Sequence, residues 1–317
     1  MPAPDGKKSL TSSAVPAKAD TFSGPRDGEN TFARLRTYWE LTKPRVNLLI
    51  VLTAFVGFYM GALGPMDWPQ VLNFLLGIAC LSGGAAALNQ FMDRDMDAAM
   101  KRTARRPLPS GRLLPHEALR FGNVLALTGM AYLWLSTGPG MAMLGFATLF
   151  MYVGLYTPLK RKTALAVLVG AFPGAMPPLM GWAAASGRVS LGGWALFSIQ
   201  FLWQLPHILA IAWRYRDEYQ QAGFLQLTDL DAEGRAAGRQ MVLYALALIP
   251  ASLAPTFIGL TGPVYLIGAL ALGAAYTGFS IRAAVKPSNA SALGLFLVSI
   301  NYLSFLFILM MLDKHHL

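Results

Sequence analysis

Charged residues are scarce in this sequence. Only 13% of the residues are Asp, Glu, Lys or Arg, whereas a typical soluble domain carries about a quarter. Apolar residues make up 55% of the chain, and the mean hydropathy is +0.45. Such a chain is poorly suited to water and well suited to lipid. The composition therefore excludes an ordinary soluble domain and indicates an integral membrane protein.

Cysteine is almost absent, since Cys80 is the single one among 317 residues. One thiol excludes an internal disulfide framework and a cysteine-based metal cluster. Acidic residues are also few, with 16 Asp and Glu against 26 Lys and Arg, which gives a net charge of +10. Basic excess can indicate nucleic-acid binding, but here the basic residues lie in short segments between apolar runs, where they set membrane orientation. We therefore expect membrane lipid as the environment and no nucleic-acid partner.

Long apolar runs dominate the rest of the chain. A helix needs about 20 apolar residues to cross the hydrocarbon core of a bilayer. Hydropathy predicts nine such spans, over residues 46–64, 70–90, 117–137, 140–158, 164–185, 192–213, 241–260, 263–282 and 292–312. Pro173, Pro177 and Pro178 interrupt the fifth span, which a bundle tolerates because neighbouring groups satisfy the freed carbonyls. The sequence thus predicts an all-α membrane protein with nine transmembrane helices.

The charges are unequally divided between the two ends of these spans. If the N-terminal segment lies in the cytoplasm, every lysine and arginine except Arg188 and Lys314 falls on the cytoplasmic side. The positive-inside rule then places the N-terminus in the cytoplasm and, after an odd number of spans, the C-terminus outside. Residues 1–30 lack the apolar stretch of a cleavable signal peptide. Because they are rich in Pro, Gly, Ser and Lys, we expect a disordered cytoplasmic tail, with residues 31–317 as the membrane domain.

Acidic side chains follow the second predicted span, at the start of a long cytoplasmic connection. Asn89, Asp93 and Asp97 recur at every fourth residue, so on a helix they share one face. Carboxylates this close to hydrocarbon are costly, and they repel one another unless a cation neutralises them. Oxygen ligands of this kind suit Mg²⁺, which takes one or two carboxylates plus substrate phosphates. We therefore predict a magnesium site at these three residues, whereas Asp95 lies off their face and is expected to form a simple ion pair.

A basic cluster follows directly, within residues 101–112. A metal-bound diphosphate requires such a cluster, because arginine forks bind the phosphate oxygens that the metal leaves free. Membrane orientation alone explains the cluster more simply. Taken together with the acidic face before it, the cluster favours a diphosphate site.

Four further residues are candidates. Tyr156 and Lys160 share a helical face and lie within reach of an anion at the same rim. Asp217 follows the sixth span and is either a second metal ligand or the ion-pair partner of a neighbouring arginine, and spacing favours neither. His207 lies inside a span, where an ionisable side chain is a functional candidate by default.

These segments resemble the UbiA superfamily of intramembrane prenyltransferases, whose first aspartate-rich motif is similar to the set Asn89, Asp93 and Asp97 with its basic loop. Other segments resemble the protoheme IX farnesyltransferase branch of that superfamily. They are residues 41–45, 103–112, 156–163, 174–182 and 203–207. The likeness covers roughly residues 38–312.

The resemblance implies a bundle around a central cavity that opens to the cytoplasmic side and laterally to lipid. It implies transfer of the farnesyl group of farnesyl diphosphate to a vinyl group of heme B, with addition of water, to give heme O and diphosphate. The expected location is the inner membrane of a bacterial cell. The resemblance leaves open whether heme A synthase is a partner.

The resemblance also implies roles for individual residues. Asn89, Asp93 and Asp97 would hold Mg²⁺ on the diphosphate, and Asp217 matches the second acidic motif, although Gln221 stands where that motif often has another Asp. The residues that would neutralise the diphosphate are Lys43 or Arg45, Arg102, Arg105 or Arg106, and Lys160. Tyr156 would lie near the ionising carbon, and His207 is the candidate for heme contact.

Three other functions fit part of the pattern. The first is a prenyltransferase with an aromatic acceptor for quinone synthesis, against which the segment around Pro177 and Pro178 and the presence of His207 argue. The second is a membrane transporter, whose coupling carboxylates are expected near the bilayer midplane rather than at one rim. The third is an assembly factor that binds heme without chemistry, which the apparent metal ligands disfavour.

Overall fold

The computed structural model describes residues 31–224, residue 227 and residues 234–315. The tail predicted over residues 1–30 lies outside this part of the chain. Within it, all regular secondary structure is helical, apart from one isolated bridge between Thr261 and Lys314. Nine helical segments of the described chain are long and apolar enough to cross a membrane. The predicted all-α class and the predicted number of spans are thus confirmed.

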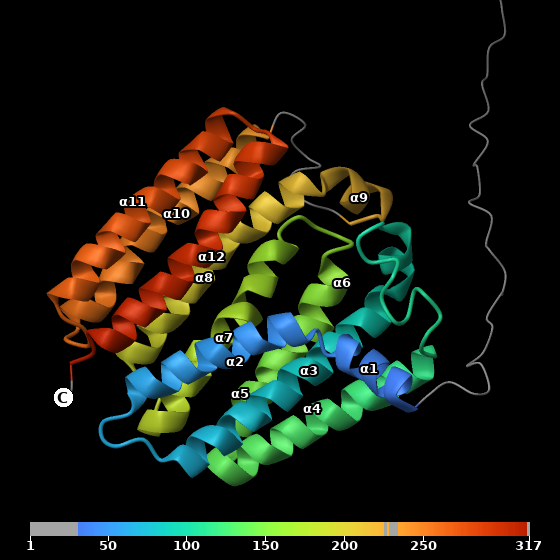
Figure 1. The fold of residues 1–317 in the computed structure, drawn as a ribbon, viewed down its shortest axis with the longest axis horizontal. Coiled ribbons are helices and arrows are strands. Elements are labelled where there is room, and N and C mark those ends of the chain that lie inside the picture. Colours follow the sequence, from blue (N-terminus) through green and yellow to red (C-terminus); the bar gives the residue numbers. More distant parts are fainter. Residues whose placement is uncertain (1–30, 225–226, 228–233, 316–317) are drawn as a thin grey trace, which may run out of the picture.

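The membrane-crossing segments follow the predicted spans closely (Figure 1). They are α2 (Pro44–Gly61), α3 (Trp68–Ala99), α4 (Pro115–Thr137), α5 with η1 and α6 (Pro139–Leu149, Phe150–Tyr156 and Thr157–Leu159), α7 (Ala166–Ser186), α8 (Leu191–Arg214), α10 (Arg235–Phe257), α11 (Pro263–Val285) and α12 (Asn289–Leu312). Two shorter helices, α1 (Thr31–Leu41) and α9 (Arg216–Gln221), lie outside the spans.

Helix α3 is longer than predicted, since it continues to Ala99 instead of ending near residue 90. Hydropathy falls where charged residues begin, but residues 91–99 contain no glycine or proline to stop a helix. Asn89, Asp93 and Asp97 therefore lie on a regular helix and not at the start of a loop. Proline does not interrupt α7 either, because the helix runs through Pro173, Pro177 and Pro178.

Close helix contacts hold the N-terminal part of the bundle together. A Cβ atom added at Gly57 of α2 would overlap the carbonyl oxygen of Pro178 in α7, and one added at Gly181 of α7 would overlap that of Ala54 in α2. Glycine thus allows the two backbones to touch, which is the usual way in which helices pack in lipid. These contacts hold α2 directly against α7.

A second group of helices, α8, α10, α11 and α12, packs around three fully buried tyrosines (Figure 1). Their hydroxyl groups are all bonded: Tyr265 donates to the carbonyl of Ser252, Tyr276 donates to that of Trp203, and Tyr302 pairs with the Ser252 hydroxyl. Helix α8 contacts both this group and α7. It therefore joins the two parts of the bundle.

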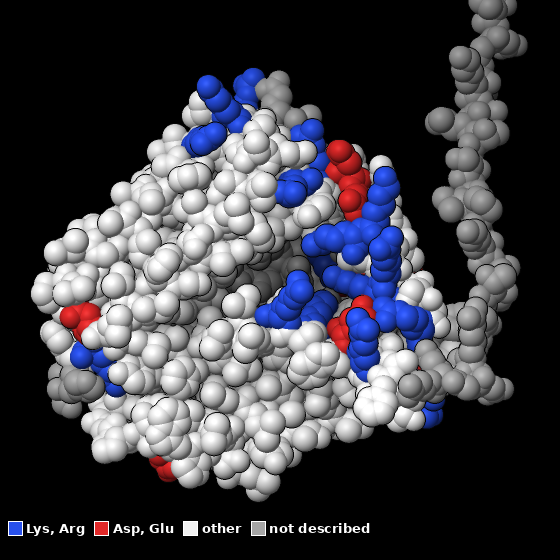
Figure 2. All heavy atoms as spheres, viewed as in Figure 1, with Lys and Arg blue, Asp and Glu red and all other residues white. Residues whose placement is uncertain are grey.

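Charged side chains gather at one end of the bundle. Figure 2 shows lysines and arginines around a hollow at that end, while most of the remaining face carries no charge. Lys314 lies at the opposite end, where its ammonium donates to the carbonyls of Tyr59 and Ala62 at the end of α2. The segregation predicted from the sequence is thus present in space as well.

Candidate active site

The acidic face of α3 lines a cavity near the charged end of the bundle. Asn89, Asp93 and Asp97 are 4%, 3% and 2% exposed, and all three side chains border this cavity. Asn89 Nδ2 donates to Asp93 Oδ2 at 2.9 Å, as expected for side chains four residues apart on a helix. A row of three oxygen-bearing side chains is therefore buried beside open space.

Each of these three side chains has a basic partner from a different segment. Lys160, which follows α6, pairs with Asp93 Oδ2. Arg106 of the α3–α4 connection pairs with Asp97 Oδ2 at 2.6 Å. Lys43 Nζ donates to Asn89 Oδ1 at 3.0 Å. Segments far apart in the sequence thus bring three cations to two carboxylates.

Three basic side chains, Lys43, Arg106 and Lys160, face two carboxylates at the site. Burial, together with nearby Arg106 and Lys160, lowers the pKa of Lys43 to about 7, although Asp93 and Asp97 oppose the shift. Burial also lowers the pKa of Lys160, against the opposing effect of Asp93. Such shifts arise where cations are desolvated and incompletely neutralised. The arrangement therefore favours an anionic ligand.

One oxygen of the site has no partner in the described chain. Asp93 Oδ1 is buried and accepts no hydrogen bond there. Burial of an ionised carboxylate oxygen costs free energy unless a cation or a hydrogen-bond donor contacts it. Among the described residues, no cluster of three His, Cys, Asp or Glu side chains is placed to hold a metal ion. Two carboxylates and an amide fit a Mg²⁺ ion that takes its other ligands from substrate phosphates and water.

Aromatic rings form the wall opposite α3. Tyr152 and Tyr156 stack at 5.6 Å between centroids on η1, a π-helical turn that the sequence did not predict. Thr157 Oγ1 donates to the Tyr152 carbonyl and accepts from Asn89 Nδ2, so the wide turn is tied to α3. The Lys160 ammonium lies between the Tyr156 ring and the Phe224 ring, 5.4 and 5.3 Å from their centroids. π-Turns of this kind occur frequently at functional sites.

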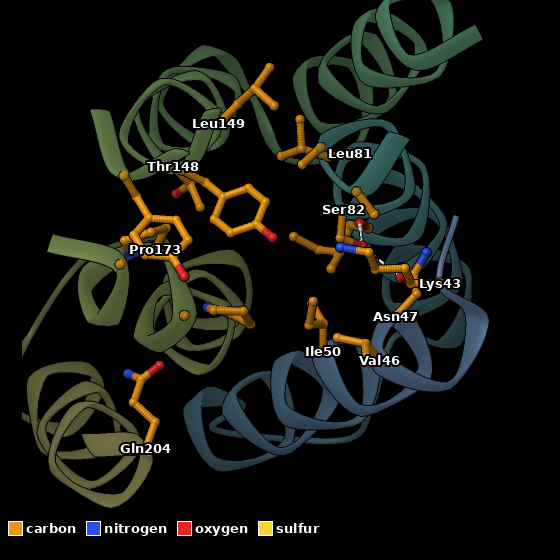
Figure 3. A pocket seen from close by; sticks show the side chains of 18 of the residues that line it. Lys43, Val46, Asn47, Ile50, Leu81, Ser82, Thr148, Leu149, Pro173 and Gln204 are labelled. Carbon is orange, nitrogen blue, oxygen red and sulfur yellow. Dashed lines mark hydrogen bonds between the residues drawn. The ribbon is translucent and has the colours of Figure 1, made fainter. Parts of the chain in front are cut away.

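Two adjoining pockets that share several lining residues form the polar lobe and the deep lobe of the site. The polar lobe, about 270 Å³, contains the acidic face and its cations, and the deep lobe, about 440 Å³, extends between α2, α3, α5 and α7. The residues that border both lobes are Lys43, Arg106, Tyr152, Tyr156, Val167 and Ile208. Apolar side chains form most of the deep lobe, and Figure 3 shows Ile50, Leu81 and Leu149 around it. A ligand with an anionic head and a long apolar tail fits this arrangement.

Most of the predicted site residues are brought together by the fold. Those that line the polar lobe are Lys43, Asn89, Asp93, Asp97, Arg102, Arg106, Tyr156 and Lys160. Arg102 also donates to the Tyr219 hydroxyl at 2.9 Å and lies over the Tyr215 ring at 4.9 Å, which ties the α9 segment to the lobe. Tyr152, Tyr219 and Phe224 line the same lobe and were missed. Tyr152 is four residues before Tyr156, so helical spacing could have found it.

Four predicted residues lie apart from the lobes. The side chains of Arg45 and Arg105 are exposed and border neither lobe. The Asp217 side chain is 83% exposed and lies 3.5 Å from Arg216. His207 faces α12, where Nδ1 lies 2.6 Å from Ser299 Oγ and the ring stacks against Trp203 and Phe296. Their predicted roles in diphosphate, metal and heme binding remain predictions.

The chain matches known proteins over most of its length. The model of the UbiA prenyltransferase family matches residues 50–308. A protoheme IX farnesyltransferase of Solibacter usitatus is 42% identical over 88% of this chain and 99% of its own length. Proteins with the same name from Koribacter versatilis and Myxococcus xanthus are 41% and 42% identical, over 92% and 86% of this chain and 96% and 93% of their own lengths.

Solved structures share the fold at low sequence identity. A structure of digeranylgeranylglyceryl phosphate synthase in membranes superimposes with a TM-score of 0.75 at 14% identity, covering 89% of this chain and 98% of that one. A UbiA homolog from Archaeoglobus fulgidus bound to GPP and Mg²⁺ gives a TM-score of 0.59 at 14% identity, covering 86% and 99%. At this identity the likeness concerns the fold alone.

Proposed function

The chain belongs to the UbiA prenyltransferase family, and from this premise we propose that it transfers the farnesyl group of farnesyl diphosphate to a vinyl group of heme B. Water adds in the same overall reaction, and heme O and diphosphate are the products. The observation that carries the proposal is the joining of a cation-rich polar lobe to a larger apolar lobe in a chain about 40% identical to protoheme IX farnesyltransferases. A membrane enzyme with these two lobes can hold both ends of a prenyl diphosphate.

The polar lobe is proposed to bind the diphosphate. Lys43, Lys160 and Arg106 already face the acidic row of α3, and Arg102 borders the same space. Their excess positive charge is available to phosphate oxygens, and arginine can bind two of them at once. Asp93, Asp97 and Asn89 are the proposed holders of Mg²⁺, which when bound supplies positive charge to the diphosphate leaving group. The Mg²⁺-bound homolog from Archaeoglobus fulgidus is consistent with this cofactor.

The tyrosine wall is proposed to lie beside the carbon that loses the diphosphate. Tyr152 and Tyr156 border both lobes, so their rings are next to the place where a head group in one lobe joins a tail in the other. The carbon–oxygen bond breaks most easily where cations stabilise the charge on the leaving oxygen. The faces of aromatic rings attract a developing allylic cation. The apolar deep lobe keeps bulk water from that cation.

Heme must approach the same carbon from another side. His207 remains our candidate for heme contact, as an axial ligand or a partner of a propionate. It lies on α8 next to Ile208, which borders both lobes, but its ring faces α12. Heme bound at His207 would therefore contact the side of α8 that faces α12.

The charged end of the bundle is proposed to face the cytoplasm of a bacterial cell, with the protein in the inner membrane. The positive-inside rule favours this orientation, because Lys314 is at the opposite end and the lysines and arginines gather around the polar lobe. The N-terminus would then be cytoplasmic and the C-terminus outside. Heme A synthase stays a predicted partner, and co-purification of the two tagged chains from solubilised membranes tests it.

Expression in a bacterial host that lacks its own heme O-forming enzyme tests the proposed function. Membrane extracts should contain heme O when the unchanged chain is expressed, and none when Asp97→Asn is expressed at the same level. If the extracts instead contain only heme B while a prenylated aromatic acid accumulates, the quinone-type acceptor is correct and the heme acceptor is wrong.

A further inference from the structure

The proposed reaction requires one water molecule inside an apolar cavity. Bond formation between the farnesyl carbon and the end of the vinyl group leaves a cation on the neighbouring vinyl carbon, and water must reach that carbon. The same cavity has to exclude water from the farnesyl cation formed before it. A single placed water molecule satisfies both requirements, so the chain should hold a polar atom near the junction of the lobes.

Gln204 has the geometry for this task. Its side chain is 7% exposed and lines the deep lobe on the wall opposite Lys43 (Figure 3). Gln204 Nε2 donates to the Ala171 carbonyl of α7 at 2.7 Å. This bond fixes the amide plane and leaves Oε1, which accepts no hydrogen bond within the part of the chain that the structure describes. The amide oxygen is therefore left for a ligand in the deep lobe that the residue lines, and a single ordered water molecule is a common partner for such an atom.

Gly174 provides the space for this oxygen. A Cβ atom added at Gly174 would overlap Gln204 Oε1. The two next nearest atoms also belong to the Gln204 amide. The absence of a side chain on α7 therefore allows the amide to reach its position. A methyl group there would displace the amide, because the three nearest atoms all belong to the Gln204 side chain.

The other polar side chains that are confined to the deep lobe are already engaged. Ser82 Oγ lies 2.6 Å from Asn47 Oδ1 and 2.7 Å from the Ile78 carbonyl. Asn47 Nδ2 donates to the Ala79 carbonyl at 2.9 Å, and Thr148 Oγ1 donates to the Leu144 carbonyl at 2.7 Å. These groups link helices or bond within their own helix. Among these groups in the described chain, Gln204 Oε1 is the side-chain oxygen for which the structure shows no hydrogen bond at all.

The position of Gln204 along α8 fits the chemistry. Ile208 borders both lobes, and Gln204 lies one helical turn deeper, about 6 Å along the axis at 1.5 Å per residue. The reacting farnesyl carbon lies at the junction, where the diphosphate ends and the chain begins. The cationic vinyl carbon is two bonds away from it. A water molecule at Gln204 is therefore close to the second cation while the head group occupies the polar lobe.

We propose that Gln204 Oε1 binds the water molecule that adds to the vinyl-derived cation. The water donates one hydrogen to Oε1 and directs a lone pair at the cationic carbon. The carbon–oxygen bond to diphosphate breaks with its electron pair on diphosphate, the new carbon–carbon bond forms, and the water oxygen then bonds to the neighbouring carbon. The proton lost by the water passes to the diphosphate. Without the water, that cation loses a proton from the adjacent carbon and becomes an alkene.

The test compares product masses from purified, full-length protein with heme B, farnesyl diphosphate and Mg²⁺. Gln204→Leu should raise the ratio of alkene product, lighter by one water molecule, to hydrated product by at least about tenfold, because one hydrogen bond to the water is lost. Gly174→Ala should do the same by displacing the amide without touching its chemistry. Gln200→Leu is the matched control, since Gln200 is buried one turn deeper and borders neither lobe.

Several outcomes overturn the proposal. An unchanged product ratio in both Gln204→Leu and Gly174→Ala rejects it, as does an equal rise in Gln200→Leu, which would indicate a general packing effect. Loss of all product in both variants also rejects it, because Gln204 would then act before water is needed. A rise in Tyr152→Phe alone assigns the water to that hydroxyl instead. This inference rests on the proposed function, whose own failure is distinct: the unchanged protein would then yield no farnesylated heme.

Discussion

Replacement of Asp93 by asparagine is the most informative single change in the site. The Asp93 side chain is 4% exposed, it pairs with Lys160, and its Oδ1 atom has no partner in the described chain. Asparagine keeps the shape and removes the charge. Lys160 then loses its carboxylate partner, and the acidic face loses one of the two carboxylates proposed to hold Mg²⁺.

The expected losses can be estimated separately for folding and for activity. Breaking a buried ion pair by removing one partner costs about 3–5 kcal/mol. Burial lowers the pKa of Lys160 and Asp93 opposes that shift, so removal of the carboxylate should lower the pKa of the lysine further. For activity, weaker stabilisation of the leaving diphosphate should cost about 3–4 kcal/mol, which lowers kcat/KM by two to three orders of magnitude. The Mg²⁺ concentration for half-maximal rate should rise by at least about a hundredfold. Loss of a residue that only hydrogen-bonds a metal ligand lowers metal affinity by up to about a hundredfold, and loss of a ligand itself should cost at least as much.

The assay is steady-state formation of heme O by purified protein across a Mg²⁺ titration, with thermal unfolding measured in the same detergent. Asp95→Asn is the matched control, because Asp95 is on the same helix, two residues away, with a side chain that is 78% exposed. It should change neither quantity. The reasoning is refuted if Asp93→Asn keeps kcat/KM within a factor of about three and the original Mg²⁺ dependence.

Other single substitutions follow from where the structure places each side chain. Lys43→Gln should raise the KM for farnesyl diphosphate at least about tenfold, since a charge-assisted hydrogen bond is lost, and Arg45→Gln should not; equal effects of the two would contradict the inward placement of Lys43. Asp217→Asn should leave kcat and the Mg²⁺ titration nearly unchanged, because the Asp217 carboxylate is exposed. A large loss of Mg²⁺ affinity in this variant would instead show that Asp217 is a metal ligand. His207→Ala should weaken heme binding, read by absorbance titration, while binding of farnesyl diphosphate is retained; unchanged heme affinity would remove His207 from the heme site. Lys314→Ala should lower the melting temperature, because two charge-assisted hydrogen bonds worth roughly 1.5–3 kcal/mol each are lost, with activity below the transition unchanged.

The spans were predictable because hydropathy reports directly which residues lipid can cover. The ends of the helices were less predictable. Helix α3 continues past its apolar run to Ala99, and hydropathy does not detect a helix that continues into charged residues. The π-helical turn from Phe150 to Tyr156 was not predictable. It is tied by Thr157 to Asn89 on another helix, and local sequence does not contain that contact.

The acidic half of the site was predictable from spacing, because side chains four residues apart on α3 share a face whatever surrounds them. The choice among basic residues was not. Lys43 sits in the turn between α1 and α2 with φ of 51°, and this backbone conformation, not its chemistry, distinguishes it from Arg45. Arg106 pairs with Asp97, whereas its neighbour Arg105 is exposed, and the order of the two arginines in the sequence does not show which one faces inward. Phe224 meets Lys160 from a distant loop, so no local pattern could identify it.

Product analysis of the purified protein tests the central claim most directly. With heme B, farnesyl diphosphate and Mg²⁺, mass spectrometry should find heme whose mass has increased by one farnesyl group and one water molecule, together with an equal amount of diphosphate. Omission of Mg²⁺ should abolish this product, and so should Asp93→Asn at the same protein concentration. Unmodified heme B as the sole heme species, under conditions in which the protein is folded and binds farnesyl diphosphate, would contradict the account.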